Sequence, residues 1–209
     1  MPSTLVHLAL GALLAAALLG DEFDGRSLLV VLAVVAFPDL DTFVGMVVPG
    51  THRAMLHTLL VPAVAAATVA YDTRLRENST LRRFGDRGVR IAWVALAAYV
   101  LAGIGPDLFY NGVNVLYPVT DHFVELNGKL YLSNHRGLVQ TVWSFSDGES
   151  PMVGTTQNVH YRTGVDVARG RDPADAERVF PLAMSGLQAL LVLTAAVVTP
   201  VRLWLDRRE

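Results

Sequence analysis

Cysteine is absent from the sequence, and charged residues make up only 17% of it. The absence of cysteine excludes disulfide bonds, thiolate metal sites and a cysteine nucleophile, but it does not identify the redox compartment of the protein. No long basic run occurs and the formal net charge is -2, so no nucleic-acid partner is predicted. The Gly-x-Ser-x-Gly turn found in many serine hydrolases is missing as well. Any metal site must therefore be built from histidine and carboxylate side chains.

Apolar residues dominate what is present. They form 52% of the 209 residues, and the mean hydropathy of +0.40 is above that of an ordinary soluble domain. A helix crosses the hydrocarbon core of a bilayer in about 20 residues. Apolar stretches of about this length occupy residues 4–20, 27–48, 55–71, 91–108 and 182–201. The sequence therefore predicts a mainly α-helical, multi-pass bundle in the cell membrane, with about five spans.

The first apolar stretch has a second interpretation as a secretory signal peptide. Ala15, Ala16 and Ala17 resemble the small-residue site at which such peptides are cleaved. Signal peptides also carry a positive N-terminal region, and no lysine or arginine precedes this apolar run. The pattern therefore favours a retained first span.

Arginine placement predicts the orientation of the spans, because short arginine-rich loops stay in the cytoplasm. Arginines gather in the 73–90 connection and after the last span: Arg74, Arg76, Arg82, Arg83, Arg87, Arg90, Arg202, Arg207 and Arg208. With these regions in the cytoplasm, the N-terminus, the 49–54 connection and residues 109–181 lie outside it. We therefore expect a membrane domain at 1–108, an extracytoplasmic insertion at 109–181, and a final span with a cytoplasmic tail at 182–209.

The 109–181 insertion is richer in polar and turn-forming residues than the rest of the chain. Asn127-Gly128 lies between two short apolar runs, and this pair tolerates the positive φ angles of a two-residue hairpin turn. We expect a β-hairpin there and further strands at Leu138–Phe145 and Val159–Val167. Asp172-Pro173 fits an N-cap and first turn, which predicts a short helix to about Val179.

Ionisable side chains interrupt the apolar spans. They are His7, Asp39, Asp41, His57 and Asp107, with His52 at a span boundary. A charge near the bilayer centre costs roughly 2.5–3.5 kcal/mol, so this group requires a compensating partner. The orientation derived from arginine places all six toward the extracytoplasmic side. A shared divalent cation would compensate them together, and we predict that these six residues are its ligands.

Local spacing supports a common site. Pro38 breaks the second span, and an extended backbone after it would direct the carboxylates of Asp39 and Asp41 the same way. His52 and His57 are five residues apart, so we expect His52 in the connection and His57 in the first turn or two of the third span. Imidazole and carboxylate ligands suit zinc, manganese or ferrous iron better than calcium or magnesium.

Hydrolysis is the reaction class that this ligand set favours. A bound metal lowers the pKa of water to about 7, and a pair of metals can clamp a phosphoester. Asp39, Asp41 and His57 would then form the catalytic centre, and Arg53 would steady the developing negative charge.

The order of motifs resembles the LexA-regulated, membrane-bound metal-dependent hydrolases of the YdjM-like type. The resemblance covers roughly residues 1–120. It comprises an early histidine (His7), a Pro-Asp-Leu-Asp motif (Pro38–Asp41), a His-Arg-x-x-x-His motif (His52–His57), and an aspartate (Asp107) before a Leu-Tyr-Pro run (Leu116–Pro118). The family is similar in motif order to zinc-dependent phospholipase C and the single-strand-specific zinc nucleases. The resemblance therefore implies a phosphoester substrate, such as a lipid headgroup, and membrane lipids as partners.

The sequence departs from the family pattern at one potential ligand. The expected histidine of the His-x-x-x-Asp motif is replaced by Gly103, while Ala54 and Thr58 are milder changes. A surface histidine of the insertion could substitute for the missing imidazole, but no spacing selects one among His122, His135 and His160.

Other interpretations stay open. Asp39 and Asp41 also fit a solvated turn at the membrane boundary, and Asp107 fits the end of the fourth span. Because of Gly103, a membrane scaffold or partner-binding protein that retains the fold without catalysis is the alternative function. A transporter is less well supported, since the chain has no recognisable inverted repeat.

Overall fold

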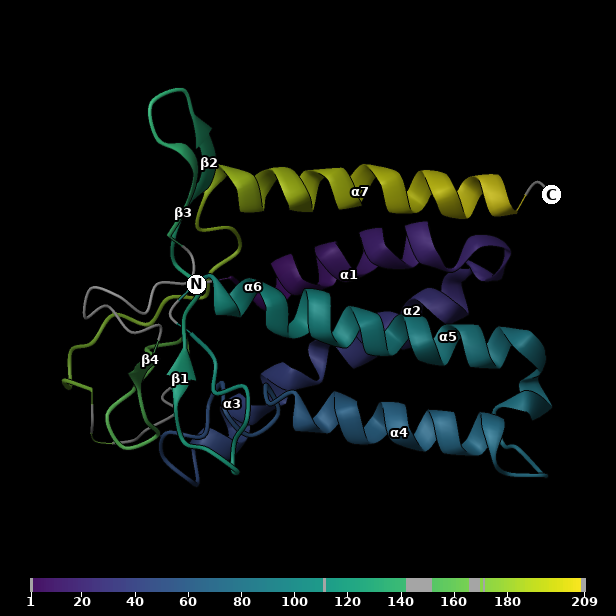
Figure 1. Ribbon diagram of the computed structural model, residues 1–209, viewed down its shortest axis with the longest axis horizontal. Helices are drawn as coiled ribbons and strands as arrows, with labels where there is room; N and C mark the ends of the chain where they lie inside the picture. The colour runs from purple at the N-terminus through teal and green to yellow at the C-terminus, as the bar shows by residue number, and fades with distance from the viewer. Residues whose placement is uncertain (1, 111, 142–151, 166–169, 171, 208–209) are drawn as a thin grey trace.

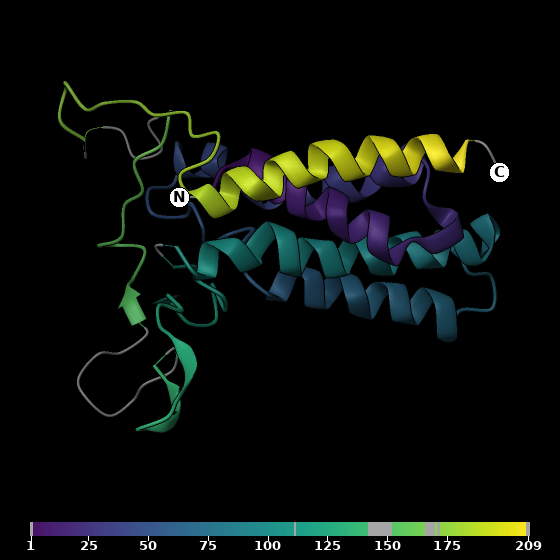
Figure 2. The same ribbon diagram turned by 90° about the horizontal axis from the view of Figure 1, so that it is seen from above.

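The computed structural model describes residues 2–110, 112–141, 152–165, 170 and 172–207. Its long helices lie side by side, and the strands and irregular segments gather at the end of the bundle that holds the N-terminus (Figures 1 and 2). The longer helices are α1 (Thr4–Leu18), α2 (Gly25–Ala36), α4 (Leu60–Arg74), α5 (Gly85–Ala98) and α7 (Gly186–Asp206). The prediction of a mainly helical protein is confirmed.

Polar caps begin three of these helices. The side chain of Ser3 accepts a hydrogen bond from the Val6 N–H at the start of α1, and Ser185 does the same for the Gln188 N–H of α7. Asp24 forms a capping box with Ser27 at the start of α2. Each cap pairs an N–H group that the first helical turn would otherwise leave without a partner.

Small residues let the central helices pack closely. Ala12 and Ala15 of α1 and Ala98 of α5 are buried in one apolar cluster with valines of α2. A Cβ added to Gly11 would lie 2.9 Å from Val35 Cγ2, so α1 and α2 approach each other more closely there than any larger residue allows. Close contact between small residues is the usual basis of helix association in membranes.

Fewer helices than predicted are long and apolar enough to be candidate membrane spans. Among the described residues, two helical runs are long and apolar enough to cross a membrane, Arg82–Leu108 with 27 residues and α7 with 21. A third candidate is the pair Gly25–Ala36 and Pro38–Gly45, whose halves are bent by 43°. The predicted spans 4–20 and 55–71 correspond to α1 and α4, which have 15 residues each. Such a helix is about 22 Å long, less than the hydrocarbon core of about 30 Å.

The hairpin lies elsewhere than predicted. Strand β2 (Leu130–Ser133) pairs with β3 (Gly137–Gln140), so the chain turns at residues 134–136 and not at Asn127-Gly128. Gly137 supplies the positive φ angle of 66°, and Ser133 Oγ accepts the N–H groups of His135 and Arg136. The glycine and the serine hydroxyl thus supply the positive φ angle and the side-chain acceptor that this turn uses.

The remaining predictions for the insertion are partly wrong. Residues 159–165 form no strand, and 166–167 lie outside the described residues. The strand predicted from Leu138 is present only as β3, and 142–145 again lie outside the described part. Of the other strands, β1 (Phe123–Val124) pairs with β4 (Met152–Gly154). The described residues from Asp172 to Val179 contain one turn and no helix, and the Asp172 carboxylate accepts hydrogen bonds from His160 and Arg178.

Asp172 joins two stretches of the insertion that precede α7. Its buried carboxylate lies 2.8 Å from His160 Nε2 and 2.6 Å from Arg178 Nη1. The hydrogen bonds from His160 and Arg178 hold the pKa of Asp172 below its usual range. These contacts are therefore complete at neutral pH and are lost as the pH falls through that lowered pKa.

We expect Asp172→Asn to accelerate trypsin cleavage after Arg178 severalfold at neutral pH, because the neutral amide cannot hold both basic groups and the segment opens more often. The measurement is the rate of limited proteolysis in detergent. The exposed residue Asp175 supplies the control, Asp175→Asn, which should be cleaved like the wild type. Equal rates for both variants would contradict this role of Asp172.

Candidate metal centre

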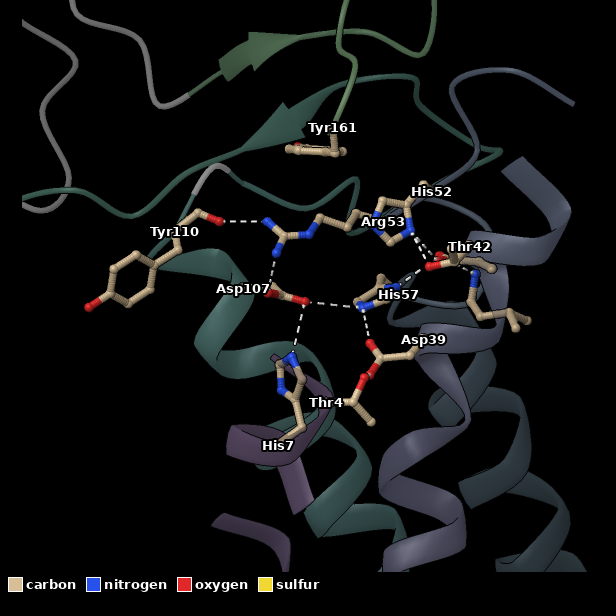
Figure 3. Close-up of polar contacts among 12 residues, drawn as sticks. Thr4, His7, Asp39, Thr42, His52, Arg53, His57, Asp107, Tyr110 and Tyr161 are labelled. Atoms are coloured by element: carbon tan, nitrogen blue, oxygen red, sulfur yellow. Dashed lines mark hydrogen bonds and ion pairs between the residues drawn. The ribbon is translucent and has the colours of Figure 1, made fainter. Parts of the chain in front are cut away.

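The six predicted ligands meet at the end of the bundle where the insertion covers the helices (Figure 3). They come from separate elements: His7 from α1, Asp39 from the 3-10 turn Pro38–Leu40, Asp41 from α3 (Asp41–Gly45), His52 and His57 from the connection before α4, and Asp107 from α6 (Gly105–Leu108). All are buried except Asp39, whose side chain is 22% exposed. The tertiary structure thus joins residues that are up to 100 positions apart, since His7 and Asp107 are neighbours.

Carboxylate oxygens and imidazole nitrogens face one another at the centre of the cluster. Potential ligand atoms of His7, Asp39 and Asp107 all lie within 4.8 Å of one another, which is close enough for one metal ion to bind all three. His57 Nε2 is 3.2 Å from Asp107 Oδ2 and 3.7 Å from Asp39 Oδ1. His57 Nε2 therefore lies within ion-pair distance of two members of this group, Asp39 and Asp107.

The buried imidazoles are oriented through their Nδ1 atoms. The Nδ1–H of His7 donates to the Ala102 carbonyl at 2.6 Å, and those of His52 and His57 donate to the two oxygens of Asp41 at 3.0 and 2.8 Å. When these imidazoles are neutral, Nε2 is the unprotonated nitrogen and can bind a metal. The Nε2 atom of His52 is buried and has no hydrogen-bond partner among the described residues, whereas Nε2 of His57 faces Asp107 Oδ2 at 3.2 Å. Metal-binding histidines commonly show this arrangement, with the other ring nitrogen held by a carbonyl or carboxylate.

The bend at Pro38 separates the two carboxylates of the Pro-Asp-Leu-Asp motif. Helix α2 ends at Ala36, as Pro38 predicts, but Asp39 lies in a 3-10 turn and Asp41 begins α3 with φ -67° and ψ -14°. The predicted extended backbone is therefore wrong. In the helical conformation the two side chains point in different directions, so Asp41 contacts the Nδ1 side of His57 and Asp39 faces its Nε2 side.

The connection that carries both histidines is longer than predicted. Helix α4 begins at Leu60, so His57 precedes the helix and does not lie in its first turns. The Tyr99 hydroxyl donates to the Leu56 carbonyl, and Thr58 Oγ1 donates to the Val115 carbonyl at 3.1 Å. These contacts secure the connection next to the cluster. No sequence pattern identified Tyr99, because an aromatic residue within an apolar span resembles any other packing residue.

Arg53 contacts protein groups instead of projecting freely toward a substrate. Its buried guanidinium donates to Asp107 Oδ1 at 2.6 Å and to the Tyr110 carbonyl at 2.7 Å, and it lies 4.8 Å from the centre of the Tyr161 ring. Arg53 has a φ angle of 61°, a conformation that side chains other than glycine rarely adopt. Burial raises the pKa of Tyr161, so its hydroxyl stays protonated and donates to the Gly112 carbonyl.

A comparison with models of protein families identifies the family of this chain. A family model described as YdjM inner membrane protein matches residues 1–166. The chain belongs to the YdjM inner membrane protein family. This confirms the resemblance expected from the motifs, and the matched range includes all six residues of the cluster. No curated protein and no solved structure matches this YdjM-family chain.

The YdjM-family chain has little space for a side chain at position 103, where a histidine was expected. Gly103 is buried in the π-helical turn Tyr99–Ile104, and an added Cβ would lie 3.1 Å from Pro38 Cγ and 3.1 Å from the Val35 carbonyl oxygen. The helix thus packs directly on the bend that carries Asp39. The insertion histidines do not replace the missing imidazole in the described structure, since His122 and His135 are exposed and His160 pairs with Asp172.

We expect Gly103→Ala to lower the free energy of unfolding by about 1–3 kcal/mol, the usual cost of overpacking a close contact. The measurement is thermal unfolding of the purified protein in detergent. Gly105→Ala is the matched control, because its added Cβ would meet only the Val100 carbonyl at an ordinary 3.4 Å. If Gly103→Ala is as stable as the control, the close packing at Pro38 is not important for folding.

A cleft of about 570 Å³ opens above the cluster. His7, Asp39 and Asp107 line it together with His52 and Arg53, so the potential metal ligands are accessible from one side. Its other lining residues belong to the start of α1, to Leu40–Phe43, and to the segments 162–165 and 179–184. The volume lies in the range of small-molecule binding sites.

Proposed function

We propose that this YdjM-family protein is a membrane-bound, metal-dependent hydrolase that acts on phosphoesters. The observation that carries the proposal is the convergence of His7 Nε2, His57 Nε2 and oxygens of Asp39 and Asp107 at one point of the structure. Buried polar atoms without partners are rare in folded proteins, and a bound cation accounts for the one at His52 Nε2, which has no partner among the described residues.

The donor set fits a divalent metal. We assign His7, Asp39, His57 and Asp107 as ligands, with His52 as a further imidazole whose Nε2 has no partner among the described residues. Two or three imidazoles with carboxylates and no thiolate suit zinc best, and manganese or ferrous iron next. Such a metal supplies Lewis-acid polarisation of a phosphoryl oxygen and lowers the pKa of water to about 7.

The side chains of the site then hold and orient the reacting groups. In hydrolysis an oxygen of water forms a bond to phosphorus, the bond from phosphorus to the leaving alcohol oxygen breaks, and a proton passes to that oxygen. Asp41 orients His52 and His57 through their Nδ1 atoms. Arg53 holds Asp107 from the side opposite the imidazoles and compensates its charge, so we assign Arg53 as a positioning residue.

We place the site on the extracytoplasmic side of the membrane. The arginine-rich connection between α4 and α5 and the C-terminal end of α7 both lie at the end of the bundle opposite the cluster (Figure 1). Because arginine-rich loops stay in the cytoplasm, this arrangement supports an extracytoplasmic site. A five-span arrangement would include α1 and α4 as short spans, which a bilayer accommodates by local thinning at a modest cost.

The test is metal content, measured by inductively coupled plasma mass spectrometry on protein purified in detergent. We expect about one zinc per wild-type chain, and at least a tenfold loss in Asp39→Ala and in His57→Ala, because the cluster has few other donors. His135→Ala, on the exposed turn of the hairpin, is the control and should match the wild type. Equal metal in all four proteins would remove the basis for a metal site at this cluster.

A panel of phosphoesters then tests the reaction. We expect hydrolysis that is abolished by a chelator and restored by zinc in the wild type and in His135→Ala. A protein that holds its metal yet cleaves none of these compounds would instead support the scaffold function, for which the glycine at position 103 is the observation in favour.

A further inference from the structure

Among the described residues that line the cleft, the only lysine or arginine side chains are those of Arg53 and Arg162. Arg53 was expected to face a substrate, but it is buried and donates to Asp107 Oδ1 and to the Tyr110 carbonyl. It therefore has little capacity left for a ligand. Arg162 differs from Arg53, because its side chain is 63% exposed. At the rim of the cleft, Arg162 is the arginine that a bound molecule would meet.

Arg162 is held through its Nε atom. This atom lies 3.3 Å from Oδ1 of the buried Asp172 carboxylate. The Arg162 guanidinium has five N–H donors, yet it donates no hydrogen bond to any described residue. Its two terminal Nη groups form a planar fork that matches two oxygens of a phosphate or a carboxylate. The contact with Asp172 thus orients the side chain, while the fork can donate to an anion in the cleft.

The carboxylate of Asp172 compensates the charge of Arg162 only in part. Its Oδ1 accepts a hydrogen bond from His160 Nε2 at 2.8 Å, and its Oδ2 accepts one from Arg178 Nη1 at 2.6 Å. Arg162 is therefore the third basic group around one carboxylate and the most distant of the three. An arginine side chain stays protonated in proteins, so much of its positive charge remains to attract an anion.

The chain next to Arg162 is anchored to the cluster. The Tyr161 ring is buried and lies 4.8 Å from the Arg53 guanidinium, and its centre is 5.7 Å from that of the His52 ring. The Tyr161 hydroxyl donates to the Gly112 carbonyl at 3.1 Å. Together with the contact to Asp172, this anchor limits the positions that the Arg162 side chain adopts. Such preorganisation lowers the entropy lost when a ligand binds.

The floor of the cleft needs a further positive charge under the proposed function. The carboxylates of Asp39, Asp41 and Asp107 face one arginine, Arg53, and one divalent ion when the metal is bound. With neutral imidazoles these charges nearly cancel, so the floor attracts a second anion only weakly. A phosphoester brings about one or two negative charges at neutral pH. Arg162 is the group at the cleft that can compensate them.

We propose that Arg162 binds the phosphoryl oxygens of the substrate and so takes the role in charge compensation that was predicted for Arg53. This inference rests on the proposed hydrolase function and adds a substrate-binding residue to it. The Nη groups of Arg162 donate to the phosphoryl oxygens while its Nε stays beside Asp172. Arg53 remains a positioning residue that holds Asp107.

The first test measures the binding of phenylphosphonate, which cannot be hydrolysed, to the full chain in a neutral detergent by isothermal titration calorimetry. We expect Arg162→Gln to raise the Kd about 10- to 100-fold, the usual loss when a hydrogen bond between charged groups is removed. Arg162→Lys should recover part of this loss, because lysine restores the charge without the planar fork. Equal Kd values for the wild type and Arg162→Gln would overturn the proposal. Binding of inorganic phosphate without binding of phenylphosphonate would overturn it too, since the site would then fit free phosphate and no ester.

Two other arginines of the insertion serve as controls. Arg136 lies exposed on the turn of the hairpin, and Arg136→Gln should keep the wild-type Kd. Arg178 contacts Asp172 but is not among the described lining residues, so Arg178→Gln loosens the same segment without removing a group from the cleft. Its Kd should stay near the wild-type value. If Arg178→Gln loses as much affinity as Arg162→Gln, the effect comes from the shape of the segment and the assignment of Arg162 is wrong.

The second test compares the hydrolysis of p-nitrophenyl phosphate by the wild type and by Arg162→Gln, with zinc content measured on the same samples. We expect KM to rise about 10- to 100-fold with a smaller change in kcat, because the phosphoryl group is charged before the reaction begins. The zinc content should match that of the wild type. A loss of zinc in proportion to the loss of activity would show that Arg162 supports the metal site, and would refute its role in binding the substrate.

The two tests separate this inference from the proposed function. Binding of phenylphosphonate that depends on Arg162, in a protein that holds no zinc and hydrolyses no phosphoester, would disprove the hydrolase while supporting the anion site. Zinc-dependent hydrolysis with the same KM in the wild type and in Arg162→Gln would support the hydrolase and disprove the assignment of Arg162.

Discussion

Asp107→Asn is expected to abolish metal binding and to lower the free energy of unfolding by about 3–5 kcal/mol, the cost of leaving one partner of a buried ion pair alone. Asp107 serves two groups at once. Oδ1 lies 2.6 Å from the buried guanidinium of Arg53, and Oδ2 faces His7 and His57 at 3.6 and 3.2 Å. The neutral amide cannot compensate the charge of Arg53, and it is a poor ligand for zinc.

The double variant Asp107→Asn with Arg53→Met separates the two effects. Removal of both charges is often nearly neutral for stability, so most of the lost free energy should return while metal binding does not. The measurements are thermal unfolding and metal content in detergent, and Asp175→Asn is the control on an exposed carboxylate. If the double variant recovers its metal as well, Asp107 is not a ligand and serves only to pair with Arg53.

Asp41→Asn is expected to weaken metal binding about 10- to 100-fold, the typical cost of losing the carboxylate that orients a ligating histidine. Both oxygens of Asp41 accept Nδ1–H groups, at 3.0 Å from His52 and 2.8 Å from His57. The amide oxygen of asparagine can replace only one of these two acceptors. The amide NH₂ group would face the Nδ1–H of the other imidazole, donor against donor, so that imidazole would move away or flip its ring. The metal site should persist with lower affinity, because Asp41 itself lies on the far side of His57 from Asp39.

The measurement is a zinc titration against a competing chelator. A residue that only stabilises the fold would change the melting temperature without changing the affinity of the folded protein for zinc. Asp24→Asn is the control, since asparagine also caps a helix well and Asp24 lies at the other end of α2. Unchanged zinc affinity in Asp41→Asn would show that the orientation of His52 and His57 does not depend on this carboxylate.

The predicted site depended on the cost of placing ionisable groups in apolar segments. That cost applies to each residue separately, so His7, Asp39 and Asp107 could be identified without knowing how the chain folds. The roles within the cluster could not be assigned in this way. Asp41 and Asp39 are two residues apart in one motif, yet one holds histidines by their Nδ1 atoms while the other faces the Nε2 of His57. The difference arises from the helical conformation after Pro38, which spacing did not predict.

The errors of the sequence analysis have a common cause. Hydropathy measures how apolar a stretch is but not where a helix begins, and so residues 55–59 were assigned to a span although they form the connection that contains His57. The hairpin was placed at the strongest local turn pair, whereas the chain turns where Gly137 and the Ser133 hydroxyl satisfy the backbone. Local sequence patterns are a poor guide to which turn position or helix start the chain adopts, because contacts between residues distant in sequence change the relative energies of these alternatives.

The amino-acid sequence was sufficient to establish a helical membrane protein of a known family and to select the histidines and aspartates that matter, because composition and the cost of burying charge are properties of single residues. The folded structure was needed to show that Arg53 binds Asp107, that Gly103 lies against Pro38, and that a cleft opens at the cluster. These facts depend on distances between residues from different helices. Such distances are set by the packing of whole elements, and no local pattern in the chain encodes them.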